Sequence, residues 1–340
     1  MSTTSAKTEQ TLSIIGCGNM GTAILNGLIE AQAAAPDTTS TTTTQLPKYY
    51  TATVRRSSTY TKLTTEFASY LKPTPTSPET PLVTILQGPN ANKLAISNSK
   101  TILLCIDPTD IPTFFADPAI RAALKGKLLI SIAAGWTRAA LFDLARPDSP
   151  GDLQILRALP NMAALVGQSI TAIEVPQPSA TATPTDPAVF KEEPPNPTES
   201  HLQTAQTIFS AIGRTIFIPP SQMTAFTAVG GSTPAFIAVF ADALIEGAVA
   251  MGFPREDAQT TVFQALRGAT ALMQEGGLHP AMLRDQGTSP GGCTMGGLMV
   301  LEERGFRGTV ARGVREAVSV AGLMGRRDAQ EEGGFVNGTR

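Results

Sequence analysis

The sequence predicts an α/β N-terminal domain built on a mostly parallel sheet, followed by an all-α C-terminal domain. In the first half of the chain, short runs rich in Ile, Leu and Val alternate with amphipathic stretches, as strands and crossover helices do. Beyond about residue 220 these strand signals stop. The 340 residues also suggest two domains, at about 150 residues per domain.

The expected strands are short apolar runs at residues 11–15, 51–54, 101–106 and 127–134. Amphipathic stretches at 21–32 and 112–124 are the expected helices between them. Two polar segments interrupt this alternation. Residues 36–45 are nearly all Thr and Ser, and residues 176–197 contain seven prolines. We therefore predict a domain over 1–220 that carries flexible insertions at 36–50 and 176–200.

The C-terminal domain is expected over 221–330, with a tail at 331–340. Its helices are predicted at 233–251, 254–273, 294–303 and 308–323. The first of them is apolar around most of its circumference, which is typical of a helix covered on nearly every side. A short helical domain offers too little cover for it, so we predict a subunit interface there.

Composition excludes several functions. The formal net charge is -2, from 26 basic and 28 acidic residues, which argues against a nucleic-acid partner. Gly, Pro or a charge interrupts each candidate for the 18 to 20 apolar residues of a membrane span, so none is expected. The N-terminus lacks the features of a signal or transit peptide, which predicts a cytoplasmic protein. With three scattered cysteines and two histidines, no metal site is expected.

Gly16, Gly18 and Gly21 form a GxGxxG motif between a predicted strand and a predicted helix. In that context the first glycine permits a tight turn, the second lets backbone amides approach a pyrophosphate, and the helix N-terminus attracts the negative charge. The motif predicts a Rossmann-like dinucleotide site. The alternative is a glycine-rich turn without a ligand.

The next expected strand ends at Arg55, Arg56 and Ser57. NAD sites usually have an acid there for the ribose hydroxyl, whereas two guanidinium groups and a hydroxyl suit a 2'-phosphate. This favours NADPH, with NADH as a further candidate. The alternative is a pair of solvated arginines on a loop.

A third motif, GTSPGGCTMGG at residues 287–297, leads into a predicted helix. The Ser289-Pro290 turn, the backbone amides of Gly291 and Gly292, and the hydroxyl of Thr294 would form a cradle for a carboxylate. On spacing alone, a well-capped helix preceded by a turn explains the pattern better.

Together these motifs resemble the delta-1-pyrroline-5-carboxylate reductase family. The matching segments cover nearly the whole chain apart from the two insertions: GCGNM at 16–20, Asn92, SIAAG at 131–135, LRALPN at 156–161, FSAIG at 209–213, GGSTPAF at 230–236, MGFPRE at 251–256 and TSPGGCTMGGL at 288–298. The last segment is far more specific than the glycine motif.

The resemblance implies a Rossmann-like domain, a helical dimerisation domain, and a homodimer or a larger ring of such subunits. It implies that NADPH reduces the imine carbon of a cyclic imino acid, 1-pyrroline-5-carboxylate, giving L-proline. The catalytic residues would be Ser289 and Thr294, and the substrate would also meet Pro290, Gly291 and Gly292. The cofactor would contact Gly16, Gly18, Asn19, Met20, Arg55, Arg56, Ser57, Asn92, Asp107, Pro108, Ala133, Ala134, Gly135, Pro160 and Asn161. For Asn161, a capping role is an equal alternative.

Two departures bear on the substrate. The family usually has Val-Lys-Pro where this chain has Ile106-Asp107-Pro108, and Thr233 stands where a glycine is usual. They leave open a reductase for another cyclic imine, such as a six-membered imino acid. A non-catalytic NADPH-binding dimer is a further alternative, although the retained SPGG-x-T segment argues against it.

Overall fold

The computed structural model of the protein describes residues 8, 10–34, 46–74, 77–145, 152–176 and 194–323. These residues divide into two compact units. One contains the described residues up to Gly231 together with Ala321–Leu323, and the other contains Ser232–Val320. The division falls inside a long helix rather than at the predicted boundary of 220/221, which stays a prediction.

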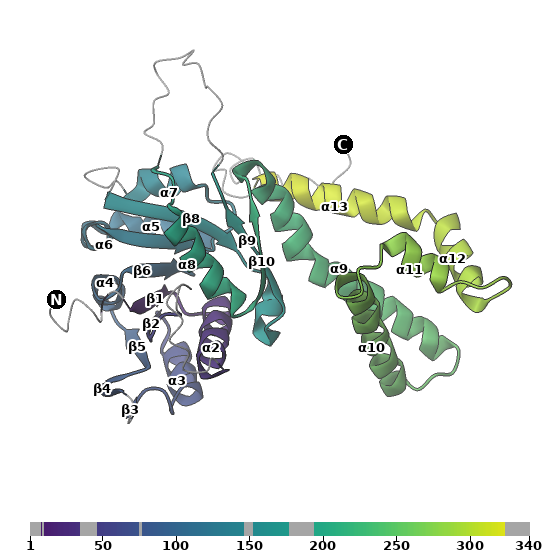
Figure 1. The fold of residues 1–340 in the computed structure, drawn as a ribbon, viewed down its shortest axis with the longest axis horizontal. Helices are drawn as coiled ribbons and strands as arrows, with labels where there is room; N and C mark the ends of the chain where they lie inside the picture. The colour runs from purple at the N-terminus through teal and green to yellow at the C-terminus, as the bar shows by residue number, and fades with distance from the viewer. Residues whose placement is uncertain are drawn as a thin grey trace, which may run out of the picture. The chain divides into compact units, whose positions relative to one another are not determined.

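The first unit is built on a sheet that contains eight strands in the described part of the chain (Figure 1). Their spatial order is β10 (Gly213–Ile218), β9 (Ser169–Glu174), β8 (Leu153–Leu159), β7 (Lys127–Ser131), β6 (Thr101–Leu104), β1 (Thr11–Ile15), β2 (Tyr49–Val54) and β5 (Val83–Gln87). The six strands from β8 to β5 pair in parallel, whereas β9 is antiparallel to β8. The predicted mostly parallel, Rossmann-like sheet is confirmed. A separate antiparallel pair joins β3 (Pro73–Thr74) to β4 (Ser77–Pro81).

Helices cover both faces of this sheet, as Figure 1 shows. One face packs against α2 (Asn19–Ala34), α3 (Ser57–Glu66) and α8 (Glu199–Ser210), and the other against α4 (Ala91–Ser97), α5 (Ile111–Ala116), α6 (Pro118–Ala123) and α7 (Arg138–Ala145). Successive residues of β1 alternate between the two cores, with Ile14 in one and Ile15 in the other. This two-sided burial explains why the strand sequences are rich in Ile, Leu and Val rather than alternating between apolar and polar residues.

Both predicted insertions end earlier than expected, because a strand or a helix begins before the C-terminal bound that we predicted. β2 begins at Tyr49, inside the segment predicted as an insertion at 36–50. Its second residue, Tyr50, is buried in the core that also contains residues of α2. α8 begins at Glu199, inside the segment predicted at 176–200, where Thr198 and His201 form a capping box. Residues 36–45 and 177–193 lie outside the described residues.

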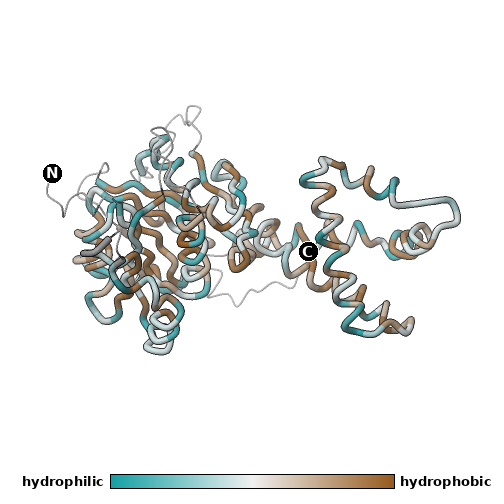
Figure 2. Tube along the Cα trace, turned by 60° about the horizontal axis from the view of Figure 1, so that its bottom comes forward, coloured by the Kyte–Doolittle hydropathy of each residue, from teal (hydrophilic) through white to brown (hydrophobic). Residues whose placement is uncertain are grey.

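The second unit contains five helices among the described residues, the first of which begins in the first unit. They are α9 (Met223–Ala250), α10 (Arg255–Gln274), α11 (Pro280–Gln286), α12 (Cys293–Glu303) and α13 (Phe306–Leu323). The four predicted helices are found, and α11 is additional. Many large apolar side chains on them are exposed, among them Val239 at 73% and Met299 at 66%, and Figure 2 shows apolar residues recurring along these helices. Such exposure marks an interaction surface.

One helix passes the length and composition test that we expected no segment to pass. Among the described residues, the helical segment Pro220–Ala250, formed by η5 (Pro220–Gln222) and α9, is long and apolar enough to cross a membrane by length and composition alone. The segment is interrupted by small residues, by Pro234 and by two acids, Asp242 and Glu246, and its mean hydropathy still stays high. The same apolar surface is what a helix in a subunit interface requires.

Candidate functional site

The three glycines after β1 have three distinct surroundings. Gly16 has φ +82°, and a Cβ atom there would lie 2.6 Å from Cγ2 of Ile106, so only glycine fits. Gly21 would bring a Cβ within 3.1 Å of Ile14, because α2 crosses β1 closely there. A Cβ on Gly18 would meet nothing within 4 Å. The backbone is therefore open to a ligand at the second glycine of the motif.

This turn lies at the carboxyl ends of β1 and β6, where the strand order reverses. The chain leaves β1 towards β2 on one side, whereas β6 pairs with β1 on the other. Ligands of doubly wound sheets bind at such a switch point. Hydrogen bonds fix the turn: the N–H groups of Gly16 and Cys17 donate to Oγ1 and O of Thr53, at 3.1 and 2.7 Å. The amides in the first turn of α2, which begins at Asn19 and Met20, have no acceptors within their own helix.

Arg55, Arg56 and Ser57 follow β2 at the same edge, as predicted. Arg56 is the N-cap residue of α3, and Ser57 is its first residue. The Arg55 guanidinium lies 3.0 Å from a carboxylate oxygen of Asp110 and is 75% exposed. Gln87, at the end of β5, donates to Oγ of Ser57 at 3.1 Å. Sequence reasoning did not identify Asp110 or Gln87, which no motif marks.

Asp107 and Pro108 follow β6. The Asp107 carboxylate accepts hydrogen bonds from the amide and the hydroxyl of Thr109, at 2.9 and 2.6 Å, and caps η1 (Pro108–Asp110). These bonds hold the pKa of Asp107 below its usual value, and the charge of Arg55 lowers it further. The exposed carboxylate is thus ionised at the edge where the cofactor is expected.

The segment after β7, Ala133 to Gly135, lies beside the segment after β6. Gly135 has φ +80°, which turns the chain, and Nε1 of Trp136 donates to the carbonyl of Pro108 at 2.9 Å. Asn92 is half-buried in the first turn of α4. Contacts of these residues with a cofactor stay predictions.

Asn161 follows Pro160 and β8, and its side chain is engaged within the protein. Its Oδ1 accepts from the amide of Ala163 at 3.3 Å, which caps η3 (Met162–Val166), and Nδ2 donates to the carbonyl of Gly230 at 2.9 Å. Four residues later in α9 stands Pro234, which has no N–H to donate to that carbonyl. Asn161 therefore supplies the hydrogen bond that the proline removes. The capping role is found, and a contact with the cofactor stays a prediction.

The SPGG-x-T segment lies in the second unit, between α11 and α12. Gly291 has φ +66°, and the amide of Gly292 donates to the carbonyl of Ser289 at 2.9 Å. A Cβ on Gly292 would lie 2.5 Å from Oγ of Ser289, so that hydroxyl points at the start of α12. Thr294 is the second residue of this helix and is exposed. The structure thus brings together Ser289, Gly292 and a helix N-terminus, the elements of an anion cradle.

The residues after β1 and β2 fit a dinucleotide phosphate: an open backbone at Gly18, a helix N-terminus, and two arginines at the end of the next strand. A nucleophilic role for Cys17 does not fit, because burial raises the pKa of its thiol to about 12. Within the described ranges, no group of three or more His, Cys, Asp or Glu residues could hold a metal ion.

Two family models match the chain. Residues 220–324 match pyrroline-5-carboxylate reductase dimerisation, and residues 11–135 match NADP oxidoreductase, coenzyme F420-dependent.

Whole-length relatives agree with these matches. The chain is 39% identical over 351 residues to a pyrroline-5-carboxylate reductase of Lophium arboricola, covering 100% of this chain and 99% of the relative. It is 34% identical over 352 residues to one of Neurospora crassa, covering 98% of each.

Two solved structures share the fold. A pyrroline-5-carboxylate reductase from Coxiella burnetii aligns with a TM-score of 0.71 at 22% identity, over 94% of this chain and 99% of that one. A Plasmodium falciparum pyrroline carboxylate reductase with NADP bound aligns with a TM-score of 0.66 at 21% identity, over 93% and 98%.

Proposed function

Since this chain belongs to the pyrroline-5-carboxylate reductase family, we propose that its two units divide the reaction, the first holding NADPH and the second holding the imino acid. The chain is an NAD(P)H-dependent reductase that converts 1-pyrroline-5-carboxylate to proline. Helices of the matched segment 220–324 associate subunits into a homo-oligomer. A dimer as the basic unit, larger rings and a cytoplasmic location are proposals.

At the first unit, the pyrophosphate would lie against Gly18, with the amides of Asn19 and Met20 donating to it. The open space beside Gly18 supports this placement, because a phosphate oxygen needs direct access to the backbone. Arg55, Arg56 and Ser57 would hold the 2'-phosphate. The rest of the cofactor would follow the carboxyl edge of the sheet along Asn92, Asp107, Pro108, Ala133, Ala134, Gly135 and the Pro160-Asn161 turn.

At the second unit, the substrate carboxylate would bind Oγ of Ser289 and the amides around Gly291 and Gly292. The orientation of the Ser289 hydroxyl towards the start of α12 is the observation that carries this proposal. A carboxylate there gains both direct hydrogen bonds and the positive end of the helix dipole. Pro290 restrains the turn and keeps the donors in place.

Thr294 would hydrogen-bond the imine nitrogen. Bound NADPH supplies the hydride that the imine carbon accepts. A threonine hydroxyl has too high a pKa to be the final source of the proton, so it orients the nitrogen or relays a proton from water. An iminium that is already protonated would need only the orientation.

The experiment is a panel of five- and six-membered cyclic imino acids, each mixed with purified protein and NADPH while NADPH absorbance is followed. We expect turnover with the five-membered 1-pyrroline-5-carboxylate, because the whole-length relatives of this chain are pyrroline-5-carboxylate reductases. Turnover confined to six-membered substrates would refute the assigned substrate. It would indicate that Asp107 and Thr233, which differ from the usual family residues, accompany a change of substrate. Tight NADPH binding without turnover of any imine would refute the enzymatic role.

A further inference from the structure

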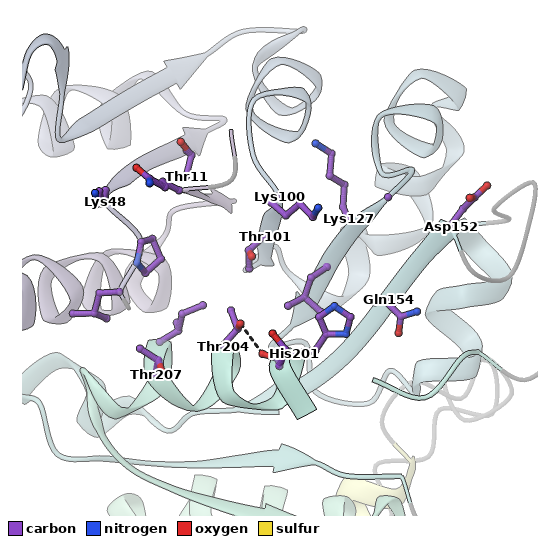
Figure 3. Close-up of a pocket in the computed structure, with 17 residues that line it drawn as sticks. Thr11, Lys48, Lys100, Thr101, Lys127, Asp152, Gln154, His201, Thr204 and Thr207 are labelled. Carbon is purple, nitrogen blue, oxygen red and sulfur yellow. Dashed lines mark hydrogen bonds between the residues drawn. The ribbon is translucent and has the colours of Figure 1, made fainter. Parts of the chain in front are cut away.

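The first unit has a cavity of about 410 Å³ that the reductase reaction does not use. It is lined by residues that begin strands: Thr11 of β1, Thr101 of β6 and Lys127 of β7, as the close-up in Figure 3 shows. The opposite side is formed by the first turns of α8. Parallel strands all begin at one edge of a sheet, so this cavity lies at the edge opposite the carboxyl ends where NADPH is placed.

Positive charge dominates the lining. Lys48, Lys100 and Lys127 come from three different segments, before β2, before β6 and at the start of β7. Nζ of Lys127 also donates a hydrogen bond to the carbonyl of Ser99 at 2.5 Å. Asp152 is the one acid among the lining residues, and its carboxylate is 3.1 Å from Nζ of Lys125, which partly neutralises it. The lining therefore has an excess of positive charge, which attracts anions.

His201 adds a hydrogen-bond donor. Its Nδ1 accepts a hydrogen bond from the amide of Thr198 at 3.2 Å, so the neutral ring carries its proton on Nε2. Burial lowers the pKa of His201, and the charge of Lys100 lowers it further; the same two causes lower the pKa of Lys127. The charge of Lys100 thus disfavours the charged forms of His201 and Lys127, and a bound anion would offset this effect.

The side chain of Gln154 indicates that the ligand also carries a hydrogen-bond donor. Its Oε1 is buried and has no hydrogen-bond partner among the described residues. A buried acceptor without a partner is costly, and a hydroxyl on the ligand would satisfy it. A phosphate monoester or a protonated phosphate combines negative charge with such hydroxyl groups. The volume is within the range of about 300 to 1,000 Å³ that is common for small-molecule sites.

We propose that this cavity at the amino ends of β1, β6 and β7 binds a small phosphate-bearing metabolite, separately from NADPH. Lys100 holds the phosphate oxygens, Lys48 and Lys127 add positive charge, His201 donates to the ligand, and Gln154 accepts from it. A ligand bound in this cavity contacts residues of three strands and of α8 at once, and it therefore stabilises the folded first unit.

The main test is calorimetric titration of pyrophosphate into the full-length protein at constant ionic strength. The protein is first saturated with NADP⁺, so that pyrophosphate cannot bind at the glycine turn. We expect saturable binding that Lys100→Gln weakens by about tenfold or more. Lys93→Gln removes the same charge from an exposed position on α4 outside the cavity lining, and it should bind as the wild type does.

Two results of this titration would overturn the proposal: no saturable binding to the wild-type protein, or equal binding by Lys100→Gln and Lys93→Gln. Imine turnover by the same variants reports on the separate reductase assignment. Lys100 has no place in that reaction, so normal turnover by Lys100→Gln also shows that the variant is folded.

Proton NMR of the histidine rings locates the ligand in the unaltered protein. The chain has two histidines, His201 at the cavity and His279 at the start of α11. Pyrophosphate should shift the ring resonances of His201 and leave those of His279 in place. A shift of His279 alone, or of neither, would refute the assigned location.

Discussion

Gly18→Ala is expected to weaken NADPH binding without destabilising the protein, in contrast to Gly16→Ala. A Cβ on Gly18 meets no atom within 4 Å, so alanine fits the unliganded chain. The added methyl group occupies the space in which a phosphate oxygen would approach the backbone amides. We expect the Kd for NADPH to rise about tenfold or more, which corresponds to at least ~1.4 kcal/mol of binding free energy.

Gly16→Ala tests whether the first glycine of the motif is required for folding rather than for access of the cofactor. The left-handed conformation, φ +82°, costs an alanine about 1 to 2 kcal/mol. The Cβ would also lie 2.6 Å from Cγ2 of Ile106 and 3.0 Å from its backbone nitrogen, and relieving such an overlap costs roughly 1 to 3 kcal/mol. We therefore expect a loss of about 2 to 5 kcal/mol in the free energy of unfolding.

Thermal unfolding followed by circular dichroism, together with calorimetric titration of NADPH, separates the two variants. Gly18→Ala should melt like the wild type and bind poorly, and Gly16→Ala should melt earlier. If Gly18→Ala bound NADPH with wild-type affinity, the pyrophosphate could not lie against this backbone.

Replacing both Arg55 and Arg56 by Ala should raise the KM for NADPH about tenfold or more and leave the KM for NADH nearly unchanged, because only NADPH carries the 2'-phosphate; an equal rise in both KM values in steady-state assays would contradict this role. Thr294→Ala should lower kcat by about 10- to 100-fold while the Kd for NADPH stays constant, since the hydroxyl is assigned to the imine nitrogen; unchanged kcat would remove that assignment. Iodoacetamide at about pH 8 should modify the exposed Cys293 and leave Cys17 intact in the folded protein, because the pKa of Cys17 is raised to about 12; mass spectrometry of peptides measures both, and early labelling of Cys17 would show that the β1 turn opens readily.

The central strands could be predicted because they are buried on both faces, which favours mostly apolar residues at positions such as 11–15 and 127–131. β9 was not predicted, because it carries polar residues that depend on distant partners. The Glu174 carboxylate pairs with Arg157 on β8 at 2.6 Å, and Oγ of Ser169 accepts from the amide of Asn161. β10 was missed for another reason, since this edge strand leaves Ile216 and Phe217 exposed.

The start of α9 could not be predicted either. Local propensity places a break at the glycines and proline of residues 230–234, whereas the helix runs through from Met223. The hydrogen bond from Asn161 to Gly230 stabilises the helix there, and such long-range compensation has no local signal. For the site, motifs and the family resemblance predicted the glycine turn, the arginines and the Ser289 segment. They gave no signal for Gln87, Asp110 or Trp136, whose positions beside the predicted residues depend on how the strands associate.

Trp136, the single tryptophan of the chain, stands at the edge of the sheet where NADPH is placed. Indole emits in the wavelength range in which reduced nicotinamide absorbs, and the bond to Pro108 keeps the ring beside the loop that follows β6. Its fluorescence is therefore an intrinsic donor for energy transfer to the cofactor. Quenching of this emission during an NADPH titration reads occupancy directly, without a label and without substrate.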